Sequence, residues 1–290
     1  MPESAKFADY LELTNPRLSM LSVLTAVVGY AVARPFAGWT TFGWVLLGAS
    51  LAAGGVASLN QWLEHETDAR MKRTSDRPIP SGKVATGSAF VLGAAMCIFS
   101  LMLLFALVNG LAALCALLTM VAYLGWYTPA KPTSRWSTEI GAVAGALPPL
   151  IGNAAATNTI TPLGWTLFGI MFFWQIPHFM AVAWTYRRDY AAVHFPMLPV
   201  RDESGAWVAR WALVTSILLV LFSLLPCVLH RTSLWYGAAA ALFGGWMLWQ
   251  AIAFLRPKRR DAAARQLFLA SIGYLPLILI ALVADRLIHF

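Results

Sequence analysis

Three oxygen-bearing side chains recur at a spacing of four residues, namely Asn60, Glu64 and Asp68. At 3.6 residues per turn, each step of four rotates by only about 40°, so the three side chains lie along one stripe of a helix. Two carboxylates and an amide oxygen suit Mg²⁺, which commonly takes one or two carboxylates, keeps waters and accepts further oxygens from a phosphate. The spacing therefore predicts a Mg²⁺ site on this stripe.

Cations follow this stripe directly, as Lys72, Arg73 and Arg77 in "KRTSDRP". Arg and Lys bind phosphate oxygens through charge-assisted hydrogen bonds, so a metal on one side and these cations on the other would bind a diphosphate. The alternative interpretation is an ordinary solvated loop with ion pairs such as Asp68–Lys72. Pro78 and Pro80 then indicate a turn that stops the helix.

A second segment with similar chemistry is "WQIPHFMAVAWTYRRDYAAVHFPMLP", from Trp174 to Pro199. Asp189 offers a carboxylate for a second metal, and Arg187 and Arg188 offer charge for phosphate. His178 precedes Arg187 by nine residues, or roughly 13 Å along a helix, and an ionisable residue at that depth in a membrane is a functional-site hypothesis. The alternative is a histidine hydrogen-bonded between helices. Pro177 frees a backbone carbonyl and can bend the helix around a cavity.

The elements that must position these side chains are membrane helices. The chain has 290 residues, of which 59% are hydrophobic and 12% charged, and a bilayer core needs about 20 apolar residues per helix. Stretches without Asp, Glu, Lys or Arg cover residues 18–33, 35–63, 84–130, 140–186, 211–230, 232–255 and 266–284. Two of them are of double length and break at Asn109-Gly110 and around Asn158–Pro162. We therefore expect an all-α protein with about nine transmembrane helices in a single domain, 1–290.

Charge predicts the orientation of these helices. All Lys and Arg except Arg34, Arg231 and Arg286 lie in the N-terminal segment or in the connections at 64–83, 131–139, 187–210 and 256–265. With nine spans these segments share one face, which the positive-inside rule makes cytoplasmic, so the basic charge needs no nucleic acid to explain it. The first 17 residues show neither a signal-peptide nor a transit-peptide pattern, which favours a bacterial inner membrane with a cytoplasmic N-terminus.

Taken together, these segments resemble the UbiA-type superfamily of intramembrane prenyltransferases, and within it the branch that farnesylates haem. The resemblance covers roughly residues 10–200. Its Asn-x-x-x-Asp-x-x-x-Asp motif corresponds to Asn60, Glu64 and Asp68, with Glu64 in place of the usual Asp. Its Trp-x-x-Pro-His-Phe element corresponds to Trp174, Pro177 and His178 with Phe179. The other matching stretches are "LTNPR" at 13–17 (with Asn15 in place of the usual Lys), "ALPPLIG" at 146–152, and Asp189-Tyr190 followed by "FPMLP" at 195–199.

The resemblance implies a central cavity opening to the cytoplasm, farnesyl diphosphate as donor and haem b as acceptor. It assigns Mg²⁺ to Asn60, Glu64, Asp68 and Asp189, and diphosphate to Lys72, Arg73, Arg77, Arg187 and Arg17. His178 is expected to orient or ligate the porphyrin, or to act on water. The expected lining of the prenyl or haem pocket is Trp174, Pro177, Tyr127, Tyr186 and Tyr190. A downstream haem-modifying enzyme or a terminal oxidase assembly is an expected partner.

Two other functions compete with this interpretation. Another enzyme of the same superfamily, acting on an aromatic quinone precursor, would share the Asp-rich motif but not the Pro-His-Phe and "PMLP" elements. A haem or ion transporter would use His178 as a ligand and the stripe as an ion path, yet transporters often repeat broken helices in both halves, and the sequence shows no such correspondence. Residues beyond about 210 are expected to be scaffold.

Overall fold

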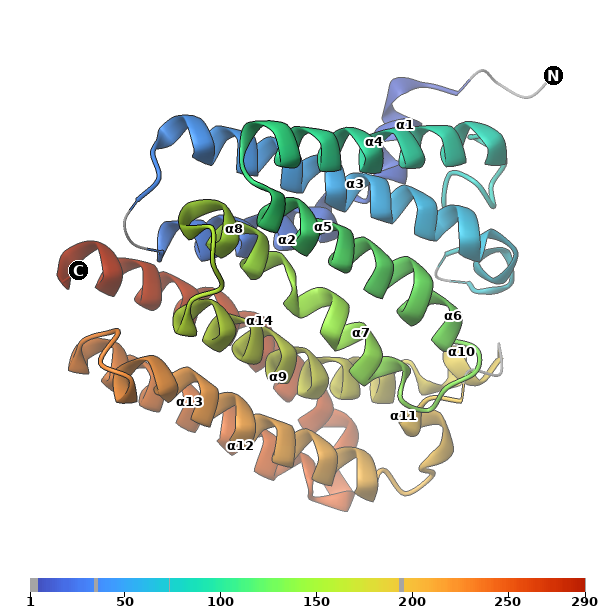
Figure 1. The fold of residues 1–290 in the computed structure, drawn as a ribbon. Helices are drawn as coiled ribbons and strands as arrows, with labels where there is room; N and C mark the ends of the chain where they lie inside the picture. Colours follow the sequence, from blue (N-terminus) through green and yellow to red (C-terminus); the bar gives the residue numbers. More distant parts are fainter. Residues whose placement is uncertain (1–4, 34–35, 73, 193–195, 290) are drawn as a thin grey trace. The chain divides into compact units, whose positions relative to one another are not determined.

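A computed structural model describes residues 5–33, 36–72, 74–192 and 196–289. The described chain is helical, as the sequence predicts (Figure 1). It divides into two compact units, residues 1–130 with 147–160, and residues 131–146 with 161–290. Each unit is built from helices whose apolar side chains pack against one another and, on the outside, remain exposed.

The first unit contains the helix pair that carries the predicted metal site. Its elements are α1 (Phe7–Leu13), α2 (Pro16–Ala31), α3 (Trp39–Arg70), α4 (Thr86–Leu107), α5 (Gly110–Met120), the π-helix η1 (Val121–Tyr127), α6 (Thr128–Ala130) and α8 (Pro148–Thr157). The 32-residue α3 runs beside α4, and α2 packs against α8 (Figure 1). Small residues make these contacts close, because a glycine lets two helix backbones approach without a side chain between them.

The second unit is organised around α9 (Pro162–Thr185), which packs against α7 (Ser137–Ala146), α12 (Ala206–Val228) and α14 (Arg260–His289). The remaining elements are α10 (Arg187–Ala192), α11 (Leu198–Arg201), α13 (Leu234–Phe254) and the short 3₁₀ helix η2 (Pro257–Arg259). Most of α9 is buried, which accounts for its almost uninterrupted apolar sequence. Pro177 lies inside this helix, which continues through it.

Eight helical stretches among the described residues are long and apolar enough to cross a membrane: Trp39–Arg70, Thr86–Leu107, Gly110–Ala130, Ser137–Thr157, Pro162–Thr185, Ala206–Val228, Leu234–Phe254 and Pro257–His289. The remaining predicted span is α2, whose 16 residues fall short of the usual length. The count of nine is therefore not confirmed. The breaks between α4 and α5 and between α8 and α9 lie where the sequence predicts them. A further break separates α7, which ends at Ala146, from α8, which begins at Pro148.

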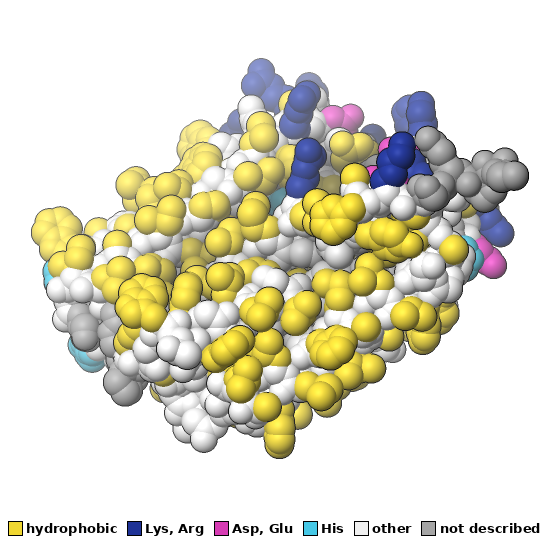
Figure 2. All heavy atoms as spheres, turned by 90° about the horizontal axis from the view of Figure 1, so that it is seen from above, with side chains coloured by type: hydrophobic (Ala, Val, Ile, Leu, Met, Phe, Trp, Pro, Cys, Tyr) yellow, Lys and Arg dark blue, Asp and Glu magenta, His cyan; other side chains and the backbone are white. Residues whose placement is uncertain are grey.

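The outer surface matches a lipid environment. Large side chains such as Phe105, Trp235 and Leu242 are at least 70% exposed. Figure 2 shows hydrophobic side chains over most of the viewed face. An exposed apolar surface of this extent is costly in water and expected in a bilayer, so the chain is a multi-pass membrane protein.

Candidate active site

The last turns of α3 carry Asn60, Glu64 and Asp68, hereafter the α3 stripe. The predicted helical continuation is confirmed, because α3 runs without interruption to Arg70. Asn60 and Asp68 are buried, at 7% and 4% exposure, and Glu64 is half-buried. Burial of two polar side chains on one stripe requires partners for them, and both find partners within the first unit.

Asp68 is held by the chain that follows α3. The guanidinium Nη1 of Arg77 lies 2.6 Å from Asp68 Oδ2 in an ion pair. The hydroxyl of Thr74 donates to the Asp68 carbonyl at 3.0 Å, and so does the Met71 amide at 3.2 Å. The segment after α3 thus folds back on the helix end and returns a cation to the stripe. Lys72 is exposed, and Arg73 lies outside the described residues.

Asn60 is held by a hydroxyl from another helix. Its Nδ2 lies 3.1 Å from the Oγ1 of Thr128, which follows η1 directly. The Thr128 hydroxyl in turn donates to the Tyr123 carbonyl at 2.9 Å. Tyr127, a predicted pocket residue, is half-buried and meets the Tyr123 ring edge-on at 5.1 Å between centroids.

The "LTNPR" stretch is tied to α3 beside the stripe. Gln61, which is buried, donates through Nε2 to the Leu13 carbonyl at 2.8 Å. Asn15 then adopts a left-handed conformation, with φ of 45°, and Pro16 begins α2. Arg17 is exposed in the first turn of α2. A short polar residue such as Asn tolerates the left-handed region better than most, which explains its place at this sharp turn.

His178 is enclosed by α9 and α14 in the second unit. Its Nδ1 lies 2.8 Å from Ser271 Oγ, its ring stacks on Trp174 at 5.1 Å, and Phe268 lies 5.1 Å away on another side. The Ser271 hydroxyl donates its only proton to the Phe268 carbonyl at 2.6 Å, so it accepts from His178 Nδ1–H. The neutral ring therefore presents Nε2 as its basic nitrogen.

The sequence analysis left two interpretations of His178, a functional residue and a histidine hydrogen-bonded between helices. The histidine is hydrogen-bonded between helices, as the structural alternative required, and only Nδ1 serves that bond. Trp174 is fixed by the same serine, since its Nε1 donates to the Ser271 carbonyl at 2.7 Å. Ser271 thus orients two predicted site residues at once, His178 and the pocket residue Trp174. Pro177 is buried next to them.

Arg187 is positioned by a small network at the end of α9. Its guanidinium lies 4.3 Å from the Trp184 ring centroid, and Nη1 donates to the Trp184 carbonyl at 2.7 Å. Asp261 of α14 accepts from Trp184 Nε1 at 2.7 Å and lies 3.4 Å from Arg187 Nη1. Four short contacts among three residues hold the cation at the surface, where its side chain remains 31% exposed.

The remaining predicted residues lie near Arg187 in α10 and at the end of α9. Asp189 and Arg188 are exposed, Tyr186 is 48% exposed, and Tyr190 is half-buried. Of the "FPMLP" stretch, residue 195 lies outside the described residues, and Pro199 is buried. The structure therefore assembles one group of site residues on α3 and its neighbours and a second on α9, α10 and α14. Their meeting at one central cavity stays a prediction.

The chemistry of the α3 stripe fits Mg²⁺ better than a metal that needs a complete protein cage. Within the described parts of the chain, no three His, Cys, Asp or Glu side chains lie close enough to hold a metal by themselves. Mg²⁺ commonly uses one or two carboxylates and completes its shell with water and substrate oxygens. Asn60 and the carboxylates of Glu64 and Asp68 supply hard oxygen donors of that kind.

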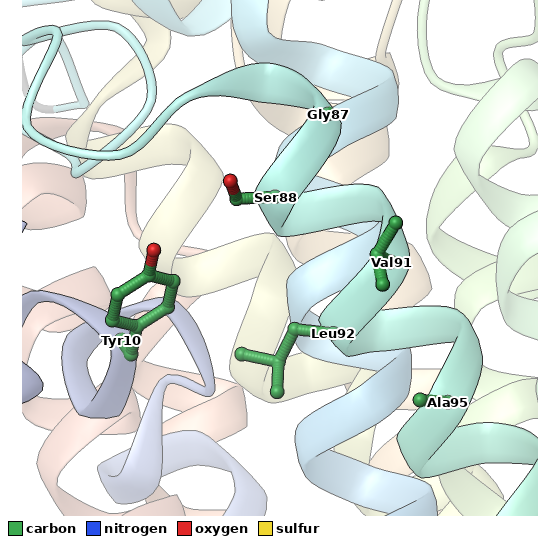
Figure 3. A pocket seen from close by; sticks show the side chains of 6 residues that line it. All are labelled: Tyr10, Gly87, Ser88, Val91, Leu92 and Ala95. Atoms are coloured by element: carbon green, nitrogen blue, oxygen red, sulfur yellow. The ribbon is translucent and has the colours of Figure 1, made fainter.

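A groove of about 510 Å³ lies between α1 and α4, and no residue of the α3 stripe lines it (Figure 3). It is lined by Tyr10, Gly87, Ser88, Val91, Leu92 and Ala95. Its walls are mostly apolar, with two hydroxyls, and it holds no carboxylate or cation. This lining lacks the groups that phosphate or metal binding requires.

The residues of these networks that are absent from the sequence prediction include Gln61, Thr128, Asp261 and Ser271. The two last belong to α14, which the sequence analysis treats as scaffold. Ser271 occurs in an apolar run and Asp261 in a basic connection, so neither carries a motif that points to the site. Thr128 follows the aromatic "YLGWY", and no motif in the sequence links it to Asn60, its partner in the structure.

Comparison with known proteins shows the family to which the chain belongs. Residues 22–272 match the model of the UbiA prenyltransferase family. A protein of Opitutus terrae named protoheme IX farnesyltransferase is 68% identical over 284 residues, covering 98% of this chain and 96% of its own. A protein of Solibacter usitatus with the same name is 39% identical, covering 96% of this chain and 98% of its own.

Solved structures agree on the fold. A structure described as digeranylgeranylglyceryl phosphate synthase has a TM-score of 0.83 at 18% identity, covering 96% of this chain and 98% of its own. A UbiA homologue from Archaeoglobus fulgidus, solved with GPP and Mg²⁺, has a TM-score of 0.67 at 14% identity, covering 95% and 99%. Because the family model matches residues 22–272 and these relatives cover nearly the whole chain, this chain belongs to the UbiA prenyltransferase family.

Proposed function

We propose that this enzyme transfers a farnesyl group from farnesyl diphosphate to a vinyl group of haem b and so produces haem O. The observation that carries the proposal is the 68% identity, over nearly the full length, to a protein named protoheme IX farnesyltransferase. We further propose that residues 1–290 act as one prenyltransferase domain in a bacterial inner membrane, with the N-terminus in the cytoplasm. A haem-modifying enzyme or a terminal oxidase assembly would receive the product.

The reaction needs a strong electrophile because a vinyl group is a weak nucleophile. The bond between the first farnesyl carbon and oxygen breaks, and its electron pair leaves with diphosphate. The vinyl terminus bonds to that carbon, water adds to the carbon next to the porphyrin, and a proton is lost, which gives the hydroxyethylfarnesyl group. Every atom of the product then comes from haem, the donor or water.

The α3 stripe would stabilise the leaving group. Asn60, Glu64, Asp68 and, from α10, Asp189 would hold Mg²⁺, which when bound neutralises charge that develops on the departing diphosphate. Around them, cationic side chains would bind the phosphate oxygens. These are Arg17, Lys72, Arg73, Arg77 and Arg187. Arg77 lies 2.6 Å from Asp68, which puts one of these cations beside a proposed metal ligand.

Aromatic side chains would shield the allylic cation from water. Trp174, Tyr127, Tyr186 and Tyr190 are the proposed lining, together with Pro177, and a ring face near a cation contributes about 0.5–2 kcal/mol. His178 would act through Nε2, the nitrogen that its bond to Ser271 leaves free. That nitrogen can ligate the haem iron or accept the proton of the added water, and both roles need the orientation that Ser271 imposes.

One experiment tests donor, acceptor and reaction together. Purified protein in detergent is incubated with haem b, farnesyl diphosphate and Mg²⁺, and the extracted haem is analysed by mass spectrometry. A mass gain of farnesyl plus water would support the proposal. Diphosphate release with unmodified haem would retain prenyl transfer and replace haem with a phenolic quinone precursor as acceptor. No product and no diphosphate release from folded protein would overturn it.

The same assay tests the metal site. Asp68→Ala is expected to abolish transfer while the protein still inserts and folds, because the stripe loses a carboxylate. The matched control is Asp76→Ala, since Asp76 is an exposed acid in the same connection. Full activity of Asp68→Ala would contradict the assignment of metal to the α3 stripe.

A further inference from the structure

The orientation of the Asn60 amide is determined by a hydrogen-bond chain across the first unit. Asn60 Nδ2 lies 3.1 Å from Thr128 Oγ1, and Thr128 Oγ1 lies 2.9 Å from the Tyr123 carbonyl oxygen. Asn60 and Thr128 are each 7% exposed. At this burial the hydrogen-bond chain is shielded from water, so water does not readily replace any of its hydrogen-bond partners.

The donor and the acceptor in each of these hydrogen bonds follow from counting the available protons. A carbonyl oxygen only accepts, so the Thr128 hydroxyl must give its single proton to Tyr123. The hydroxyl then has only lone pairs for Asn60 and can bind the amide NH₂ but not the amide oxygen. Asn60 therefore turns its nitrogen toward Thr128 and its Oδ1 away, and a side-chain amide has only that oxygen to offer a metal.

A π-helix places Thr128 at this point. The backbone N–H of Thr128 also donates to the Tyr123 carbonyl, five residues earlier, at the end of η1. A π-turn takes in one more residue than an α-turn, so the residues after it are rotated relative to a continuous α-helix, and such turns are frequent at functional sites. Both η1 and α6 contact α3. The irregular turn therefore presents a hydroxyl to the α3 stripe.

We propose that Thr128 is a positioning residue for the metal site. Presented by η1, it holds the Asn60 amide with Oδ1 available as an oxygen ligand on the stripe that carries Glu64 and Asp68. This inference rests on the proposed metal site and adds a residue outside the Asp-rich motif. Loss of such a supporting hydrogen bond typically lowers metal affinity by about 10–100-fold.

The test compares three threonine variants. Thr128→Val keeps the shape and removes the hydroxyl, Thr128→Ser keeps the hydroxyl, and Thr119→Val is the control. Thr119 lies in the preceding helix α5 and makes a comparable bond to the Cys115 carbonyl at 2.8 Å, without contacting α3 residues through it. Binding of Mn²⁺ in the presence of farnesyl diphosphate is measured by electron paramagnetic resonance, with thermal unfolding recorded for each variant.

We expect Thr128→Val to weaken Mn²⁺ binding by at least about 10-fold, with Thr128→Ser and Thr119→Val near wild type. A purely structural role would lower the unfolding temperature and leave the Mn²⁺ affinity of the folded protein unchanged, which would overturn the inference. Asn60→Ala separates the two proposals. If Asn60→Ala weakens Mn²⁺ binding and Thr128→Val does not, only the role of Thr128 fails. If Asn60→Ala has no effect either, Asn60 is not a metal ligand, and Asp68→Ala decides whether the rest of the stripe binds metal.

Discussion

The "ALPPLIG" stretch leads to a prediction about packing, because its glycine has no room for a side chain. A Cβ added at Gly152 would lie 1.8 Å from the Ala26 carbonyl oxygen and 2.6 Å from the Tyr30 nitrogen. In the same interface, a Cβ at Gly29 would lie 2.0 Å from the Pro149 carbonyl oxygen. All of these atoms are backbone, so no rotamer change can relieve the contact, and α2 and α8 would have to separate.

The expected change in the free energy of unfolding of Gly152→Ala is the sum of two opposing contributions, steric overpacking and helix propensity. Overpacking of a rigid contact costs typically 1–3 kcal/mol, and we take about 3 kcal/mol because only backbone atoms surround the site. Alanine in a helix interior is favoured over glycine by about 1 kcal/mol. Gly152→Ala should therefore lower the free energy of unfolding by about 2 kcal/mol. The matched control is Gly43→Ala in α3, because a Cβ added there meets nothing within 4 Å. This control should raise the free energy of unfolding by up to about 1 kcal/mol.

Thermal unfolding of both variants in one detergent measures the difference. At roughly 2–4 °C per kcal/mol, Gly152→Ala should unfold about 4–8 °C below wild type and Gly43→Ala slightly above it. Equal unfolding temperatures for Gly152→Ala and wild type would refute the reasoning, because the helices would then be able to separate without loss of contacts.

Three further predictions concern single side chains. Burial raises the pKa of Asp202, but hydrogen bonds from the Val208, Trp207 and Gly205 amides and the Ser204 hydroxyl outweigh it, so the pKa is lowered. Asp202 thus stabilises the fold above its unfolded pKa of about 3.9 and loses this effect as pH falls through the lower folded pKa. The Asp202→Asn variant should therefore be less stable than wild type at pH 7, and its unfolding temperature should decline less than that of wild type below pH 4. Parallel curves of unfolding temperature against pH for the two proteins would contradict this. Ser271→Ala should reduce haem modification about 10-fold by releasing His178, whereas the unfolding temperature should change little; unchanged turnover would remove Ser271 from the site. Asp261→Asn keeps an acceptor for Trp184 but removes the charge near Arg187, so KM for farnesyl diphosphate should change with kcat constant; a change in kcat alone would speak against it.

The long uncharged stretches predicted most of the fold correctly. A bilayer requires each span to satisfy its own backbone hydrogen bonds within about 20 apolar residues, so the helices follow from composition. Turn residues at Asn109-Gly110 and Asn158–Pro162 also marked the breaks correctly. The span count was less predictable, because the uncharged stretch at 18–33 has only 16 residues and α2 is likewise a helix of 16 residues, short of the usual length of a span.

The sequence by itself determined which oxygens and cations could share one stripe, since a spacing of four on a helix depends only on helix geometry. It could not determine what holds those groups in place. Thr128 lies 68 residues from Asn60, and Ser271 lies 93 residues from His178, so each pair forms only when separate helices pack together. A lone hydroxyl in an apolar run carries no periodic signal. The tertiary structure therefore decided the orientation of the site residues, because a buried amide or imidazole is oriented by its hydrogen-bond partner.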